Sequence, residues 1–193
     1  MIRTISEDYL PMINSFSCTE NNEILIQFTA KVRRRIIEHS REMERFLKRE
    51  ALSEQENGLS TTHLFIDKDN NKIVAYVSMC NDSIGLEFNE REELELRYTT
   101  IPAVKIARLA VSSDYQGCGM GKYLIQFTAY LGERIREFSG LTFITLDCYE
   151  HRVSFYEKIG FVKNQIQPIT LPYDTPISMR LLLDEYLEQL ENV

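Results

Sequence analysis

An α+β fold built on a mixed β-sheet is the fold class that the sequence predicts. In the first half of the chain, two strand-like runs at residues 62–66 and 73–79 flank the polar segment 67–71. This pattern is typical of an antiparallel hairpin. In the second half, strand-like and helix-like segments alternate from residue 104 onward. A meander followed by such an alternation predicts antiparallel and parallel strands in one sheet with helices on its faces.

Length and composition fit one globular domain over residues 1–193. The chain is 44% hydrophobic and 26% charged, which excludes the disordered and low-complexity classes. Its apolar runs are far shorter than the roughly 18 residues that a membrane span needs. The first residues carry acidic side chains and no apolar h-region, so they do not resemble a signal peptide. We therefore expect a cytoplasmic protein with no membrane contact.

The charge balance argues against a general nucleic-acid binder. The formal net charge is −7, whereas such binders depend on neutralising phosphates with Lys and Arg. One basic cluster stands out, with Lys31 followed by three arginines at 33–35. Glutamates follow it within the same predicted helix, which is typical of a solvated helix face.

Cysteine and histidine spacing predicts no metal site. No two cysteines have the C-x-x-C spacing of a zinc or redox motif, and the histidines are equally scattered. We expect free thiols, as is usual for a cytoplasmic chain. The residues concerned are Cys18, Cys80, Cys118, Cys148, His39, His63 and His151.

The remaining elements of the first half are predicted from periodicity. Residues 2–5 form a short strand, followed by a turn at Pro11. Apolar residues recur mostly every three or four positions over residues 22–51, which predicts one long helix closed by the polar segment 53–59. Residues 81–99 are polar and acidic, and no element is assigned to them.

In the second half of the chain, the boundaries between predicted elements are clearer. Residues 104–111 read as a strand, and residues 112–121 as a glycine-punctuated loop. Apolar side chains then share one helical face as far as Ser139, and Gly140 ends that helix. The segments that follow are a buried strand at 143–148, a helix at 151–158, strands at 161–164 and 177–183, and a helix at 184–191.

The loop between strand and helix carries the chemical signal. Three glycines occupy alternate positions in the run QGCGMGK, residues 116–122. Glycine lets the backbone turn its N–H groups inward, and the positive end of the following helix adds to an anion site. The P-loop pattern fails at Gln116 and Tyr123, and the dinucleotide fingerprint fails at Lys122, where a third glycine would be needed.

A different phosphate signature does fit. The pattern Q/R-x-x-G-x-G/A matches at Gln116, Gly119 and Gly121. This is the pyrophosphate-binding signature of the GNAT superfamily of N-acetyltransferases, which the chain resembles here. The preceding run ARLAV, residues 107–111, looks like the family's fourth strand. Later, FYEKIGF at residues 155–161 is similar to the family's F-Y-x-x-x-G-F stretch. The resemblance covers roughly residues 104–183 and, more loosely, the two strands of the hairpin.

The resemblance implies a GNAT-like sheet, a donor and a set of site residues. The fourth and fifth strands would splay apart to admit the pantetheine arm of acetyl-CoA, the co-substrate. Tyr156 would protonate the departing thiolate, which suits a phenol that is protonated at neutral pH. The residues implied in coenzyme binding are Leu109, Val111, Gln116, Gly117, Cys118, Gly119, Met120, Gly121 and Lys122.

Some positions depart from the family pattern. Tyr149 stands where many members carry an asparagine, and Arg152 where a small residue is frequent. No general base is evident from the residues. Glu93, Glu95 and Asp147 are candidates by position only.

These observations predict an acetyl-CoA-dependent N-acetyltransferase that acts on a primary amine of a small molecule or a protein. A toxin-like acetyltransferase that modifies aminoacyl-tRNA is the alternative, because the chain is also similar to that subfamily. The similarity includes Ser60-Thr61-Thr62, the strand at 75–78, and a series ending in Pro168 and Leu171. The net charge of −7 ranks tRNA second. A non-catalytic acetyl-CoA-binding regulator and a homodimeric assembly also stay open.

Overall fold

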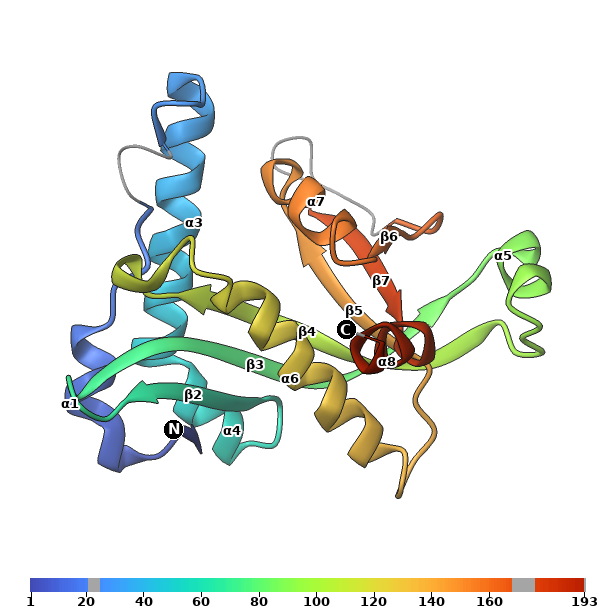
Figure 1. The fold of residues 1–193 in the computed structure, drawn as a ribbon, viewed down its shortest axis with the longest axis horizontal. Coiled ribbons are helices and arrows are strands. Elements are labelled where there is room, and N and C mark those ends of the chain that lie inside the picture. Colours follow the sequence, from blue (N-terminus) through green and yellow to red (C-terminus); the bar gives the residue numbers. More distant parts are fainter. Residues whose placement is uncertain (21–24, 168–175, 193) are drawn as a thin grey trace. The chain divides into compact units, whose positions relative to one another are not determined.

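Seven strands form one mixed sheet in the order β1-β2-β3-β4-β5-β7-β6, with helices on its faces (Figure 1). The structure is a computed structural model that describes residues 1–20, 25–167 and 176–192. It confirms the predicted α+β class with a mixed sheet. The chain divides into two compact units, Met1–Met79 with Ala107–Leu124, and Cys80–Ile106 with Ile125–Val193. The prediction of a single domain stays a prediction, and each unit is described in turn.

The first unit contains the antiparallel hairpin. Strands β2 and β3 pair antiparallel, with Thr61 opposite Met79 at one end and Asp67 opposite Lys72 at the other. This pairing confirms the predicted hairpin. The elements of this unit are β1 (Ile2–Thr4), α1 (Leu10–Ser15), α3 (Ala30–Arg49), α4 (Ala51–Glu56) and β2 (Thr61–Asp67). Three further elements, β3 (Lys72–Gly85), β4 (Thr100–Val111) and α6 (Met120–Ile135), contribute residues to both units.

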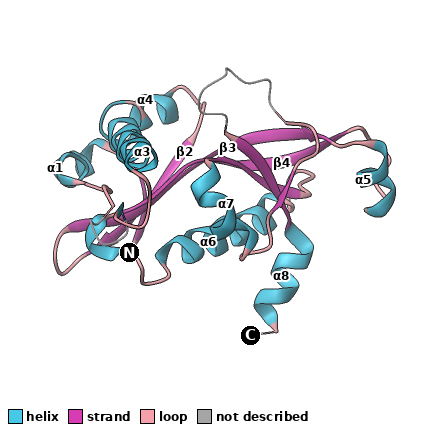
Figure 2. Ribbon diagram, turned by 90° about the horizontal axis from the view of Figure 1, so that it is seen from above, coloured by secondary structure: helices cyan, strands magenta, loops and turns pink. Residues whose placement is uncertain are grey.

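Helices α1, α3 and α4 cover one face of β2 and β3 (Figure 2). Tyr76 of β3 is fully buried there, with its ring stacked on Phe46 at 6.2 Å between centroids. Its hydroxyl donates to the carbonyl of Met43 at 2.8 Å, so the buried phenol keeps a partner. On the opposite face, Phe65 makes an edge contact with Tyr123 in the first turn of α6.

Two predictions for the first unit are wrong. The helix predicted over residues 22–51 begins only at Ala30, where the side chain of Thr29 caps it, and it ends at Arg49 before α4 continues from Ala51 to Glu56. Residues 22–24 lie outside the described part of the chain. Pro11 does not make a turn but lies in the first turn of α1, where its missing N–H costs no helical hydrogen bond.

The second unit is built around the parallel pair of strands. Residues 103–106 of β4 pair in parallel with 143–146 of β5, and β5 pairs antiparallel with β7. The predicted strand at 143–148 is confirmed, whereas helix α6 ends at Ile135, four residues before the predicted Ser139. The elements of this unit are α5 (Phe88–Glu93), β5 (Phe143–Cys148), α7 (Glu150–Glu157), β6 (Val162–Lys163), β7 (Ile177–Leu182) and α8 (Leu183–Glu191).

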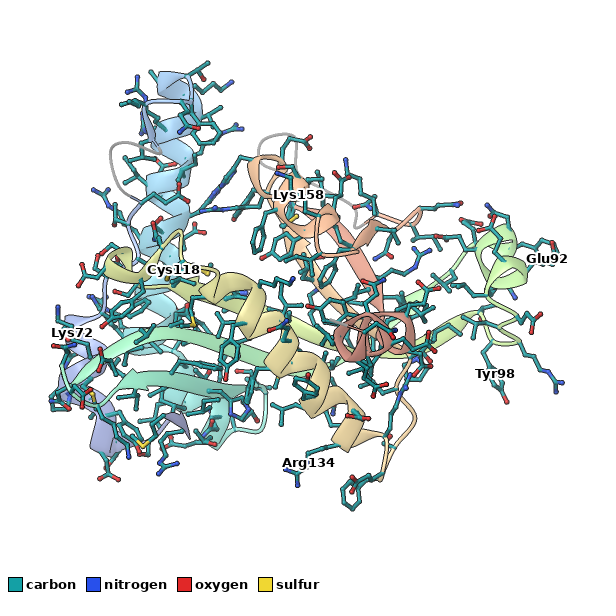
Figure 3. The ribbon with its side chains drawn as sticks, viewed as in Figure 1. Lys72, Glu92, Tyr98, Cys118, Arg134 and Lys158 are labelled. Carbon is teal, nitrogen blue, oxygen red and sulfur yellow. The ribbon has the colours of Figure 1, made fainter. Side chains whose placement is uncertain are left out.

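The segment that had no sequence assignment carries a buried ion pair. Strand β3 runs on to Gly85, and α5 begins with a capping box between Glu87 and Glu90. Glu90 is also paired with Arg180 of β7 at 2.7 Å, with only 4% and 9% of the two side chains exposed. This pair ties α5 to the sheet. Residues 86–99 form the α5 excursion between β3 and β4, and Glu92 and Tyr98 project outward from it (Figure 3).

Among the described residues, no helix is both long and apolar enough to cross a membrane.

Candidate active site

The glycine loop of the first unit has an unusual backbone. Gly117 and Gly119 have φ angles of +80° and +84°, a region that residues with a side chain rarely adopt. Both glycines are exposed, and a Cβ added at either would meet no atom within 4 Å. The backbone of this loop therefore borders open space that a ligand can approach closely.

Helix α6 begins directly after this loop and presents N–H groups to the same region. The first helical hydrogen bond runs from the N–H of Tyr123 to the carbonyl of Gly119 at 3.1 Å. The N–H groups of Met120, Gly121 and Lys122 precede it and have no partner within the helix. Together with the positive helix end, they suit a pyrophosphate. The predicted anion site therefore fits the structure.

The loop is held from behind by backbone carbonyls of the same unit. The amide of Gln116 donates to the carbonyls of Cys18 at 3.0 Å and Val111 at 3.2 Å. Its Oε1 atom is buried and accepts no hydrogen bond from the described residues. The N–H of Ser113 donates to the carbonyl of Ser17 at 3.0 Å. Gln116 thus anchors the loop, and its predicted contact with the coenzyme stays a prediction.

The two strand residues implied in pantetheine binding lie at the end of β4. Leu109 and Val111 are both half-buried and flank the buried Ala110. Because side chains alternate along a strand, Leu109 and Val111 share one face. Strand β4 runs to Val111, whereas its register with β5 covers residues 103–106. The predicted splaying of the two strands stays a prediction.

Tyr156 lies on α7, in the second unit. It is half-buried, with edge contacts to the rings of Phe155 at 5.0 Å and Phe161 at 5.5 Å. Burial raises the pKa of Tyr156 to about 12; the thiol of Cys148 adds to the rise, and Arg152 opposes it. The hydroxyl therefore stays protonated throughout the neutral range and can donate a proton.

The three candidate bases have different surroundings in the second unit. The carboxylate of Asp147 is occupied by an ion pair with Lys105 at 2.6 Å. Glu93 ends α5, and Glu95 follows it with a φ of +54°; both are exposed. None of these contacts singles out one carboxylate, so the general base is not assigned.

A basic depression lies along the first half of α3. Its volume is about 570 Å³. Arg34 pairs with Glu38 at 3.0 Å, whereas Arg33 and Arg41 make no ion pair with any described residue. Sequence inspection found the cluster at 33–35 but missed Arg41, which the helical spacing of eight residues brings onto the same face as Arg33. The lining residues are Leu25, Ile26, Ala30, Arg33, Arg34, Ile37, Glu38 and Arg41.

Comparison with known families decides the class of the protein. Residues 60–163, more than half of the chain, match the model of the acetyltransferase (GNAT) domain. The chain belongs to the GNAT acetyltransferase family. As a GNAT acetyltransferase it takes its acetyl group from acetyl-CoA. The matched segment contains the whole glycine loop and Tyr156.

Several solved structures share the fold of this GNAT acetyltransferase along its whole length. A bacterial toxin is 17% identical, with 100% of this chain and 97% of that chain covered and a TM-score of 0.72. AtaT in complex with acetyl-methionyl-tRNAfMet is 16% identical, with 98% of each chain covered and a TM-score of 0.70. A Tyr-to-Phe variant of AtaT, bound to the C-terminus of the antitoxin AtaR and to acetyl-CoA, is 14% identical, with coverages of 98% and 97% and a TM-score of 0.68. At these identities the likeness concerns the fold.

We expect Gly119→Val to abolish detectable binding of CoA in isothermal titration calorimetry. The side chain would fill the open space beside the loop and strain a backbone with φ of +84°. Gly58→Val is the matched control, because Gly58 has φ of +68°, has equally open surroundings, and lies in the turn after α4. That control should lose stability but keep its affinity for CoA. Unchanged CoA affinity in a folded Gly119→Val protein would contradict the site.

Proposed function

We propose that this GNAT acetyltransferase transfers the acetyl group of acetyl-CoA to the amino group of an aminoacyl-tRNA. The supporting observation is the likeness in fold to AtaT, whose complex contains acetyl-methionyl-tRNAfMet, over 98% of both chains. The sequence alone ranks a small-molecule or protein amine first. The end-to-end likeness reverses that order, because it includes the N-terminal region outside the matched family model. The proposal requires a cytoplasmic location, where charged tRNA is found.

The basic depression on α3 answers the objection from net charge. RNA binding depends on cations placed along one surface, and a net charge of −7 does not prevent a local basic site. Arg33 and Arg41 have no acidic partner among the described residues, so their guanidinium groups are available to phosphates. Both side chains line the same depression, which supports a role in holding the RNA backbone.

The chain's own residues have distinct tasks in the proposed reaction. The N–H groups at the start of α6 bind the pyrophosphate, and the half-buried phenol of Tyr156 donates a proton to the departing sulfur. The amine nitrogen forms a bond to the acetyl carbon, the C–S bond of the thioester breaks, and CoA leaves as the thiol with the proton from the phenol. The proton that the amine loses passes to solvent, from which the phenol is protonated again. Because the pKa of Tyr156 is about 12, its proton is present at every pH at which the enzyme would work.

A panel of acceptors tests the proposed substrate directly. With radiolabelled acetyl-CoA, we expect label to pass to aminoacyl-tRNA, and not to uncharged tRNA, free amino acids, polyamines or peptides. Label should be lost when the aminoacyl ester is hydrolysed and should be recovered on the N-acetylated amino acid. Transfer to a small amine or a peptide in the absence of charged tRNA would contradict the proposal and restore the first prediction from sequence.

Binding measurements with tRNA and with CoA separate the RNA site from the coenzyme site. A variant with Arg33→Ala and Arg41→Ala should bind tRNA more weakly, and the salt dependence of its binding should fall by about two ions. Its affinity for CoA should not change. Arg134→Ala is the matched control, because that exposed arginine lies in the last turn of α6 and does not line the depression. Equal effects of both variants would remove the basis for placing RNA on α3.

We expect Tyr156→Phe to lower kcat by roughly 10²- to 10⁴-fold, the usual cost of losing a positioned acid. The Michaelis constant for acetyl-CoA should hardly change, because binding rests on backbone groups. In the wild-type enzyme, the raised pKa predicts no alkaline fall in kcat from this group until about pH 12. Steady-state kinetics between pH 6 and 10 measure both quantities.

Tyr186→Phe is the control for the loss of a phenol hydroxyl at a buried position, since burial also raises the pKa of Tyr186 to about 12. It should leave kcat unchanged. If Tyr156→Phe raised the Michaelis constant and left turnover alone, its hydroxyl would be a binding contact. If it changed neither, Tyr156 would only pack on Phe161.

A further inference from the structure

The turn between β2 and β3 touches the segment that leads into the glycine loop. The hydroxyl of Tyr115 donates to Oδ2 of Asp67 at 2.7 Å. The two residues are 48 positions apart in the chain, and Tyr115 directly precedes Gln116. A second contact joins the same two segments, between Lys72 and Asp114 at 3.1 Å, with more than half of both side chains exposed.

Asp67 is shaped to hold this contact. Its Oδ1 accepts hydrogen bonds from the N–H groups of Asp69 at 3.0 Å and Asn70 at 3.3 Å. Its Oδ2 accepts from the side chain of Asn70 at 2.8 Å as well as from Tyr115. The side chain of Asn70, followed by Tyr115, lowers the pKa of Asp67 to about 2. The carboxylate is therefore ionised at neutral pH, and its bond to the phenol is charge-assisted.

The loop is thus held at two places. On one side, Ser113 and Gln116 bond to the carbonyls of Ser17 and Cys18. On the other, Tyr115 is fixed to Asp67. The two exposed glycines, Gly117 and Gly119, directly follow these anchored residues in the chain. A loop whose entrance is fixed loses less conformational freedom when a ligand binds, so its N–H groups bind more tightly.

We propose that Asp67 and Tyr115 form a positioning pair that presets the glycine loop for the pyrophosphate of acetyl-CoA. Neither residue touches the coenzyme in this account; each acts through the backbone of residues 116–119. The inference rests on acetyl-CoA as donor and on the glycine loop as its site, and it is independent of the acceptor.

A double-mutant cycle measured by calorimetry with CoA tests the pair. Tyr115→Phe removes one hydroxyl and should raise the dissociation constant of CoA by about three- to tenfold, the range expected for one net hydrogen bond. Asp67→Ala should raise it by at least as much. In the Asp67→Ala protein, adding Tyr115→Phe should have no further effect, because the partner is already gone.

Kinetics distinguish positioning from a general loss of structure. The Michaelis constant for acetyl-CoA should rise by the same factor while kcat stays at the wild-type value. Tyr98→Phe is the matched control, since it removes the hydroxyl of a tyrosine that is 76% exposed on the α5 excursion. It should bind CoA like the wild type.

Each other outcome overturns the inference. If Tyr115→Phe bound CoA within twofold of the wild type, the pair would serve stability alone, and a lowered melting temperature without ligand would show this. If the two substitutions added fully, Tyr115 would act without Asp67. If the wild-type protein did not bind CoA, the loop itself would be misassigned. The conservative Tyr115→Phe variant decides the matter even if Asp67→Ala fails to fold.

Discussion

Two glycines with positive φ turn the chain from β4 into α6, and the account of this enzyme depends on that backbone. Gly117 and Gly119 adopt a conformation that side chains disfavour and border open space. The turn aligns the first N–H groups of α6 toward a single region, where a doubly charged pyrophosphate gains from both the donors and the helix dipole. A side chain at either position would disfavour this backbone conformation and would fill the space through which the ligand approaches the N–H groups.

Much of the first unit can be understood as support for that turn. The glycine-containing segment is short, exposed and conformationally free, so contacts from elsewhere must fix it. The side chain of Gln116 donates hydrogen bonds to the carbonyls of Cys18 and Val111. The hydroxyl of Tyr115 donates a hydrogen bond to Asp67 of the hairpin. The hairpin, which is far away in sequence, therefore contributes to the coenzyme site without touching it. Coenzyme affinity in this account reflects the order of the loop as much as the number of its donors.

Local patterns in the sequence were enough to predict the loop, the strand before it and the helix after it. Glycine spacing and helical periodicity act over a few residues, and both are visible without a structure. The bond between Asp67 and Tyr115 spans 48 positions and carries no local signal. The buried pair of Glu90 and Arg180 likewise joins segments whose charges look solvated in sequence.

The predicted helix boundaries are wrong where a residue is compatible with two local structures. Pro11 is compatible with a turn or with the first turn of a helix, and only packing decides between them. A similar ambiguity affected residues 50–56, which continue the helical pattern but follow the break at Glu50. The proposed acceptor, too, depends on information from outside the local motifs, because net charge says little about where cations gather.

The most direct test follows backbone amide resonances of the ¹⁵N-labelled protein while CoA is added. The account predicts that the amides of residues 117–122 undergo the largest shifts and that they saturate together at one CoA per chain. It also predicts smaller shifts at Tyr115 and at the β2–β3 turn, which contact the loop and not the ligand. Saturable binding of CoA that leaves the amides of residues 117–122 unshifted would contradict the central claim that this loop holds the pyrophosphate.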